Sequence, residues 1–344
     1  MSRATGKVNL LDVARRAGVS LATASRVLNG SARNVGEDLQ QRVRSAAEQL
    51  NYSPSAPAQA MARGGTNVVG LVVPDISDPY FSTTAASIMR VAEPHELIIA
   101  LSSTQRRVER EAEYVAALRR QRARGVILVG SRTTNARHED ELRAELETFI
   151  ASGGRVAAIS QQQLPADTVV IENRAGARDL AETLAGLGYR RFAVLAGPSD
   201  LVTARDRVAG FRQGLKRSGV SLDTNDVITG EFTRDGGYDA AVELLDRDRD
   251  VECVFAVNDV MAVGAIAAFR DRDLRLPEDI AVAGFDDIVS LRDIWPPLTT
   301  VRIPLERLGE EALGFILDEQ PSDRPRARRF RGEVIVRAST PRLS

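Results

Sequence analysis

The spacing of apolar and polar positions changes once along the chain, near residue 67. Before it, apolar residues recur at the spacing of one helical face: Leu10, Val13, Ala14 and Ala17. Asn9 precedes this stretch and is a favoured N-cap residue, whereas Gly18 follows it and suits a left-handed helix end. The pattern predicts a short helix between Asn9 and Gly18.

Two further helices are expected in the first fifty residues. The second is capped by Ser20 and the third begins near Gly36–Glu37. Their predicted inner faces are Ala24, Val27 and Leu28, and then Leu39, Val43, Ala46 and Leu50. Because only Ala17–Ser20 join the first two helices, they form a helix-turn-helix candidate. Periodicity alone fits a plain three-helix bundle with a solvated polar face as well.

If the helix-turn-helix candidate binds DNA, its second helix would enter the major groove. Its outward residues are Leu21, Ala22, Ser25, Arg26 and Asn29. Arginine pairs bidentately with guanine, and Ser, Thr and Asn side chains hold phosphates.

From residue 68 on, short apolar runs alternate with amphipathic stretches. The runs are Val68–Val73, Leu97–Leu101, Val126–Val129, Val156–Ile159, Phe192–Ala196, Val254–Val257 and Ile280–Gly284. Helices are expected near 108–121, 174–187, 205–218, 236–247 and 259–272. Strands this apolar, alternating with helices, predict parallel doubly wound sheets that bind ligands at the carboxyl ends of their strands.

Charge is unevenly distributed over the 344 residues. Residues 1–66 contain nine Lys or Arg against four acids, a net charge of +5, which leaves −6 for the remainder. A basic head on an acidic body is typical of a nucleic-acid-binding module joined to a second domain. No apolar run reaches the roughly 20 residues that span a bilayer. The N-terminus has no signal-peptide pattern, and a single cysteine, Cys253, rules out an internal disulfide. The expected compartment is therefore the cytoplasm.

Catalytic chemistry finds little support. His95, His138 and Cys253 form no metal cluster, nucleophile dyad or triad that can be assembled, and neither phosphate-binding glycine motif is present. We therefore expect no catalytic residues, no metal and no cofactor.

The segment from Leu11 to Ser20, LDVARRAGVS, and the segment Thr23–Asn29, TASRVLN, closely resemble the head of the lactose/galactose repressor family. The resemblance implies that Leu21, Ala22 and Arg26 read bases. It assigns phosphate contacts to Asn9, Ser20, Thr23, Ser25 and Asn29. Three features depart from the family pattern: Ala24, Gly36 and a longer loop at 30–34.

Residues 52–66 are rich in Ala, Pro and Gly, as in a linker. In the resembled family this segment is a hinge helix that forms on operator DNA and inserts a wedge into the minor groove. Met61 takes the wedge position and Ala58 the close helix–helix contact. A flexible tether without DNA contacts is the alternative.

The resemblance extends over the core, through Gly70–Phe81, Ala204–Phe211, Val257–Asp259, Gly284–Asp287 and Pro297–Val301. It implies an all-α helix-turn-helix head (1–52), a hinge (53–67) and a two-lobed periplasmic-binding-protein-like core (68–344). The first lobe is expected at about 68–162 and 291–320, and the second at about 163–290 and 321–344.

The resemblance also implies an effector cleft between the lobes, lined by Tyr80, Phe81, Arg205, Phe232, Asn258 and Asp286. Aromatic faces with carboxylate, guanidinium and amide groups suit a sugar-like ligand. Phe232 could instead be core, Asp286 a helix cap and Arg205 an interlobe ion pair. Ser160-Gln161 replaces the family's usual Asp-Arg, which leaves the ligand class open.

The expected function is a homodimeric repressor of a palindromic operator, controlled by a small-molecule effector. A dimer is favoured over a tetramer, because no long C-terminal heptad helix of the kind that makes tetramers follows the core. A solute-binding protein, a purine-type corepressor-dependent regulator and an enzyme are the alternatives. Whether the effector induces or corepresses stays open, as do the operator sequence and the regulated genes.

Overall fold

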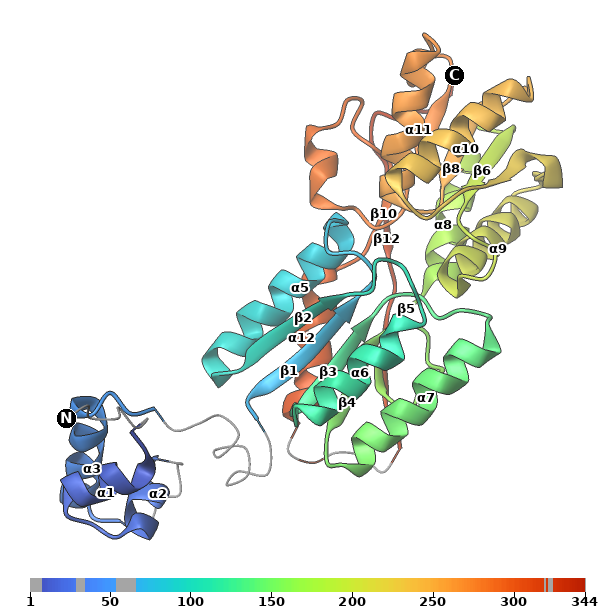
Figure 1. The fold of residues 1–344 in the computed structure, drawn as a ribbon. Helices are drawn as coiled ribbons and strands as arrows, with labels where there is room; N and C mark the ends of the chain where they lie inside the picture. Colours follow the sequence, from blue (N-terminus) through green and yellow to red (C-terminus); the bar gives the residue numbers. More distant parts are fainter. Residues whose placement is uncertain (1–7, 29–34, 54–65, 319, 321–323, 344) are drawn as a thin grey trace, which may run out of the picture. The chain divides into compact units, whose positions relative to one another are not determined.

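The computed structural model describes residues 8–28, 35–53, 66–318, 320 and 324–343. Its contacts divide the chain into two compact units, an N-terminal head and an α/β core. Each is described by itself below (Figure 1).

The head contains the three predicted helices: α1 (Leu10–Ala17), α2 (Leu21–Leu28) and α3 (Glu37–Gln49). The Asn9 side chain accepts hydrogen bonds from the backbone at the start of α1, and Gly18 ends that helix with a φ of 65°. Ser20 Oγ accepts from the Thr23 N–H at 3.1 Å, which caps α2. The inner faces of all three helices form one small core, so the predicted helix-turn-helix is confirmed.

The core contains two parallel sheets, which confirms the fold class expected from the apolar runs. The first has the order β11-β5-β4-β3-β1-β2, formed by Ala327–Phe330, Asp167–Ile171, Arg155–Ile159, Gly125–Val129, Val68–Val73 and Ile98–Ser103. The second has the order β7-β6-β8-β9, formed by Val227–Thr229, Phe192–Ala196, Cys253–Ala256 and Ala281–Ala283.

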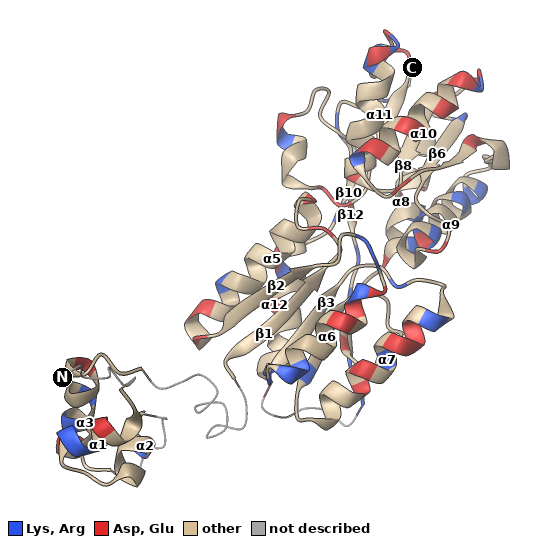
Figure 2. Cartoon of the chain, in the orientation of Figure 1, with Lys and Arg blue, Asp and Glu red and all other residues tan. Residues whose placement is uncertain are grey.

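Helices cover each sheet. Those of the first lobe are α5 (Pro79–Ala92), α6 (Arg110–Arg120), α7 (Ala136–Ala151) and α12 (Leu305–Leu317). Those of the second are α8 (Asn173–Gly186), α9 (Val202–Arg217), α10 (Arg234–Asp246) and α11 (Asp259–Asp271). Short 3₁₀ turns are η2 (Glu93–His95), η3 (Thr224–Asp226) and η4 (Val289–Asp293). Charged residues gather on the helices, whereas strands β1, β3, β6 and β8 carry none (Figure 2).

The chain crosses between the lobes three times: after β5, along β10 (Thr300–Arg302) and along β12 (Glu333–Ile335). β10 and β12 pair antiparallel with each other. The boundaries expected at 162, 290 and 320 are therefore wrong by about ten residues each. β5 and β11 belong to the first sheet, and the segment before Thr299 stays with the second lobe, where the Gly284 N–H donates to the Thr299 carbonyl at 2.8 Å.

Candidate functional site

The outward face of α2 presents the three residues predicted to read bases. Leu21 is 48% exposed, and Ala22 and Arg26 are exposed as well. This face follows from the buried positions of Ala24 and Val27, which turn the opposite side of the helix to solvent. The arrangement leaves an arginine and two small or apolar side chains available to the edges of base pairs.

Three of the predicted phosphate-contacting residues, Asn9, Ser20 and Thr23, lie at helix starts. Asn9 and Ser20 are exposed and cap α1 and α2, and Thr23 Oγ1 lies 2.8 Å from Ser20 Oγ. Ser25 is partly buried on α2. Backbone N–H groups at helix N-termini are ready anion donors, which suits these positions to phosphates. Asn29, Ala58 and Met61 lie outside the described residues.

A cavity of about 400 Å³ opens between the two lobes, at the carboxyl ends of their strands. This volume is typical of small-molecule sites. Five of the six predicted effector residues line it: Tyr80, Phe81, Phe232, Asn258 and Asp286. Tyr80 and Phe81 are in the first turn of α5, Asn258 is the N-cap of α11, and Asp286 follows β9.

Arg205, the sixth, is exposed on α9 and does not line the cavity, so its prediction as an effector residue is wrong. Arg207 takes its place and is only 2% exposed. Residues two apart on a helix point in nearly opposite directions, which explains the error. A signal was present: Ala204, Arg207 and Phe211 follow the spacing of a buried face, and all three are buried.

Arg207 organises the second-lobe wall of the cavity. Its guanidinium donates to both oxygens of Asp286, at 3.2 and 2.7 Å. It also donates to Asn173 Oδ1 at 2.9 Å and to the Val257 carbonyl at 2.8 Å, and it stacks 3.8 Å from the centre of the Phe285 ring. A bidentate, stacked arginine of this kind is held rigidly, so the Asp286 carboxylate has a fixed position in the wall. Asp286 is thus an ion-pair partner and not a helix cap.

Burial sets the electrostatics of this wall. It raises the pKa of Asp286 to about 6, although the Arg207 guanidinium lowers it. It also raises the pKa of Tyr80, which remains a neutral phenol at physiological pH. Two charged groups that neutralise each other, beside a neutral phenol and two amides, offer many hydrogen bonds and little net charge.

Aromatic rings form part of the apolar surface of the cavity. Tyr80 and Phe81 pack edge to face, with ring centres 5.0 Å apart. The Phe232 ring lies against Gly197, where the Cβ of any other residue would collide with the ring. Gly197 therefore permits the position of Phe232, which lines the cavity and also packs against the core. Rings of this kind pack against the C–H faces of a sugar.

Ser160 and Gln161 line the cavity, and Gln161 also ties the two lobes together. Gln161 Oε1 accepts from the Arg132 N–H at 2.7 Å in the first lobe. Its Nε2 donates to Thr203 Oγ1 at 2.9 Å in the second. Ser160 Oγ donates to the Gly130 carbonyl. No sequence signal points to this role, because it depends on which loops the two lobes bring together.

Other chemistry finds no support in the described part of the chain. Its His, Cys, Asp and Glu residues form no group of three that could hold a metal ion. None of its helices is long and apolar enough to cross a membrane.

Comparison with known proteins agrees with both halves of this description. Residues 9–55 match the model of the lacI family of bacterial regulatory proteins, and residues 181–340 match a periplasmic binding protein-like domain. The HTH-type transcriptional regulator DegA of Bacillus subtilis (strain 168) is 34% identical over 89% of this chain and 89% of its own.

Two solved structures extend the likeness. One is the Lac repressor dimer bound to operator and the anti-inducer ONPF, with a TM-score of 0.83 and 26% identity over 98% of this chain and 100% of that one. The other is a complex of the regulator CelR with cellobiose. It has a TM-score of 0.69 and 30% identity, and the match covers 97% of this chain and 100% of that one. The chain belongs to the lacI family of bacterial regulatory proteins and is a helix-turn-helix transcriptional regulator.

Proposed function

We propose that this regulator is a cytoplasmic repressor that binds a palindromic operator as a homodimer. Its operator affinity would be set by a sugar-like effector in the cavity between the lobes, and it would have no enzymatic activity. The observation that carries the proposal is that one chain holds both a helix-turn-helix with an exposed second helix and a cavity between two lobes that is lined by polar and aromatic side chains.

The DNA-binding part of the proposal rests on α2 and, for Ala58 and Met61, on the family resemblance alone. Leu21, Ala22 and Arg26 would contact base edges, while the starts of α1 and α2 would contact phosphates. Ala58 and Met61 would belong to a hinge helix that orders on the operator, with Met61 as the minor-groove wedge. Effector binding would act by changing how readily that helix forms.

The effector part rests on the contents of the cavity. Arg207 and Asp286 provide fixed donors and acceptors, Asn173 and Asn258 provide amides, and Phe232 provides an apolar face. The cellobiose complex of CelR supports a carbohydrate as the first class to test. Purines are the second.

The dimer part rests on an exposed apolar edge of the first lobe. β2 is the edge strand of the first sheet, and Ile98 and Leu101 on it are 63% and 38% exposed. Met89 of α5 is 41% exposed. Exposed apolar side chains on a sheet edge favour pairing with a second copy, and the Lac repressor was solved as a dimer.

A two-step experiment tests the proposal. A thermal-shift screen against neutral sugars and purines finds ligands that raise the melting temperature. Each ligand is then added to a titration of the protein with duplexes selected from a random pool. A ligand that weakens operator binding is an inducer and one that strengthens it is a corepressor. If no ligand that binds the cavity changes operator affinity, the proposal fails.

A further inference from the structure

One arginine in the cavity has a buried donor with no partner among the described residues. Arg106 follows β2 and lines the cavity. Its backbone has a φ of 61°, and that of Gln105 has a φ of 56°, a conformation that side-chain-bearing residues rarely adopt. The Arg106 N–H donates to the Pro74 carbonyl at 3.0 Å, which holds the loop against the end of β1. Two consecutive left-handed residues are typical of functional sites, where a side chain must be aimed.

The guanidinium of Arg106 is anchored through one nitrogen. Nη2 lies 3.2 Å from Asp78 Oδ2 and 3.5 Å from Asp75 Oδ2. Both acids are themselves held, because Asp78 accepts from the Tyr80 N–H and Asp75 from the Ser77 N–H, each at 3.0 Å. The anchor therefore holds one end of the guanidinium without using its Nε–H.

Nε of Arg106 is buried and makes no hydrogen bond within the described ranges. A buried donor of a charged group without an acceptor is costly, and most such groups in folded proteins have a partner. A purely structural ion pair would not require this donor to be withdrawn from water. An acceptor atom supplied by a bound ligand would satisfy it.

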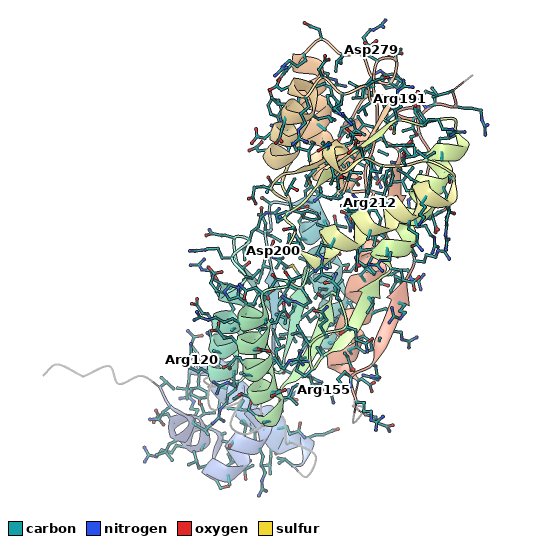
Figure 3. The ribbon with its side chains drawn as sticks, turned by 90° about the vertical axis from the view of Figure 1, so that its right-hand side faces the viewer. Arg120, Arg155, Arg191, Asp200, Arg212 and Asp279 are labelled. Atoms are coloured by element: carbon teal, nitrogen blue, oxygen red, sulfur yellow. The ribbon has the colours of Figure 1, made fainter. Side chains whose placement is uncertain are left out.

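The charges around the cavity limit what that acceptor can be. Arg106 faces two carboxylates, and Arg207 is matched by Asp286. The exposed lining residues Glu109, Asp200 and Glu231 form no ion pair in the part of the chain that the structure describes, and they outnumber the one exposed cation in that lining, Arg107. Asp200 lies between the two lobes (Figure 3). A phosphate or carboxylate on the ligand would enter a region that already has excess negative charge.

We propose that Arg106 is a specificity-determining effector-binding residue whose Nε–H donates to an uncharged hydroxyl or ether oxygen. The site would then take neutral polyhydroxylated ligands and reject their phosphorylated and carboxylated forms. The inference rests on the proposed function, because it concerns the same effector cavity.

Matched ligand pairs test the charge preference. The full-length protein is titrated in thermal shift with glucose, glucose 6-phosphate and glucuronate, with ribose and ribose 5-phosphate, and with cellobiose and cellobionate. We expect at least one neutral sugar to raise the melting temperature and its charged counterparts to have no effect at the same concentration. A charged form that binds as tightly as its neutral partner, or a panel with no neutral binder, overturns the proposal.

Substitution tests the donor. Arg106→Lys keeps a positive charge beside Asp75 and Asp78 but removes Nε–H, and Arg110→Lys, outside the cavity, is its matched control. The affinity of Arg106→Lys for the neutral sugar should fall about tenfold, the size of a hydrogen bond to a charged group. Arg110→Lys should bind as the unmodified protein does.

A deoxy series completes the test. One monodeoxy derivative of the binding sugar should bind weakly to the unmodified protein and no more weakly to Arg106→Lys, as expected for two changes that remove the same contact. Additive losses for every derivative overturn the assignment. Operator binding is measured in parallel, with and without the sugar. If it is absent under both conditions in all variants, the proposed function fails, while the sugar affinities still decide the role of Arg106.

Discussion

At the scale of single residues, the buried ion pair of Arg207 and Asp286 holds the second-lobe wall of the cavity together. Arg207 is 2% exposed and Asp286 5% exposed, and each neutralises the other. Arg207→Ala leaves a buried carboxylate without its cation, a change that costs about 3–5 kcal/mol. We expect that loss in chemical unfolding of the core, together with loss of effector binding. Arg205→Ala, at the exposed position two residues earlier, should change stability by less than about 0.5 kcal/mol. Equal effects of the two substitutions would contradict the assignment.

A second residue-scale prediction concerns Asp259, the first residue of α11. Burial raises its pKa to about 7, while hydrogen bonds from Thr300 Oγ1 and the Ile288 N–H lower it. The folded state therefore holds a proton that the unfolded state releases near pH 4, so this group makes the free energy of unfolding fall as the pH rises from 4 to 7.

Asp259→Asn removes that titration. Between pH 5 and 7 its free energy of unfolding should fall by roughly 2 kcal/mol less than that of the unmodified protein. The measurement is urea unfolding at a series of pH values. Parallel curves for the two proteins would show that Asp259 has an ordinary pKa.

Single residues also show which parts of the cavity could be predicted from the sequence. Asn258 and Asp286 were assigned to the cleft by the family resemblance, and the strand pattern agrees, because they follow β8 and β9, whose carboxyl ends meet at the ligand site. Choosing Arg207 over Arg205 required the phase of the helix, which Ala204 and Phe211 carry. Gln161 stood out only as a departure from the family pattern. Its bond to Thr203, like that of Arg106 to Asp78, joins residues far apart in sequence and could not be predicted.

At the scale of elements, a strip of the first lobe pairs with a strip of the second. The Val202 N–H donates to the Arg132 carbonyl and the Thr134 N–H to the Asp200 carbonyl, both at 2.9 Å. Gln161 and Thr203 add a side-chain bond beside them. Together these contacts hold the lobes in the arrangement that encloses the cavity.

Thr203→Val keeps the shape of the side chain and removes its hydroxyl. Losing one hydrogen bond should make exchange of the Thr134 and Val202 amide hydrogens about fivefold faster in the effector-free protein, because the lobes separate more often. Thr203→Ser, which keeps the hydroxyl, is the control. Hydrogen-exchange mass spectrometry of the two strips measures the effect. Unchanged exchange in Thr203→Val would mean that this bond does not help to hold the lobes.

The pattern of apolar and polar residues predicted some strands and helices better than others. The strands with fully buried runs, such as β3 and β6, were predicted almost to the residue because they carry no polar positions. β5 and β11 were missed because polar or charged residues interrupt their apolar runs, as Asp167 and Thr168 do in β5 and Arg328 and Arg329 do in β11. Their absence displaced the lobe boundaries expected at 162 and 320. Helix α7 was missed because most of its surface is charged and its apolar stripe is narrow.

At the scale of the whole molecule, the proposed dimer depends on the edge of the first sheet. Ile98→Asp places a charge on the most exposed apolar side chain of that edge. We expect the variant to sediment as a monomer at micromolar concentration and to bind a palindromic operator weakly, because one head can read only one half-site. Ile150→Asp, at a 41% exposed position on α7, is the matched control. A dimeric Ile98→Asp protein would place the interface elsewhere.

Regulation by this protein depends first on whether α2 reads the operator sequence. The most direct test is the affinity of Arg26→Ala and of the unmodified protein for a selected operator duplex and for a scrambled duplex of equal length, at one salt concentration. If Arg26 contacts a base, operator affinity should fall by about tenfold or more while the affinity for scrambled DNA falls only slightly. Equal losses on the two duplexes would show that Arg26 contributes charge alone and would contradict sequence reading by this helix.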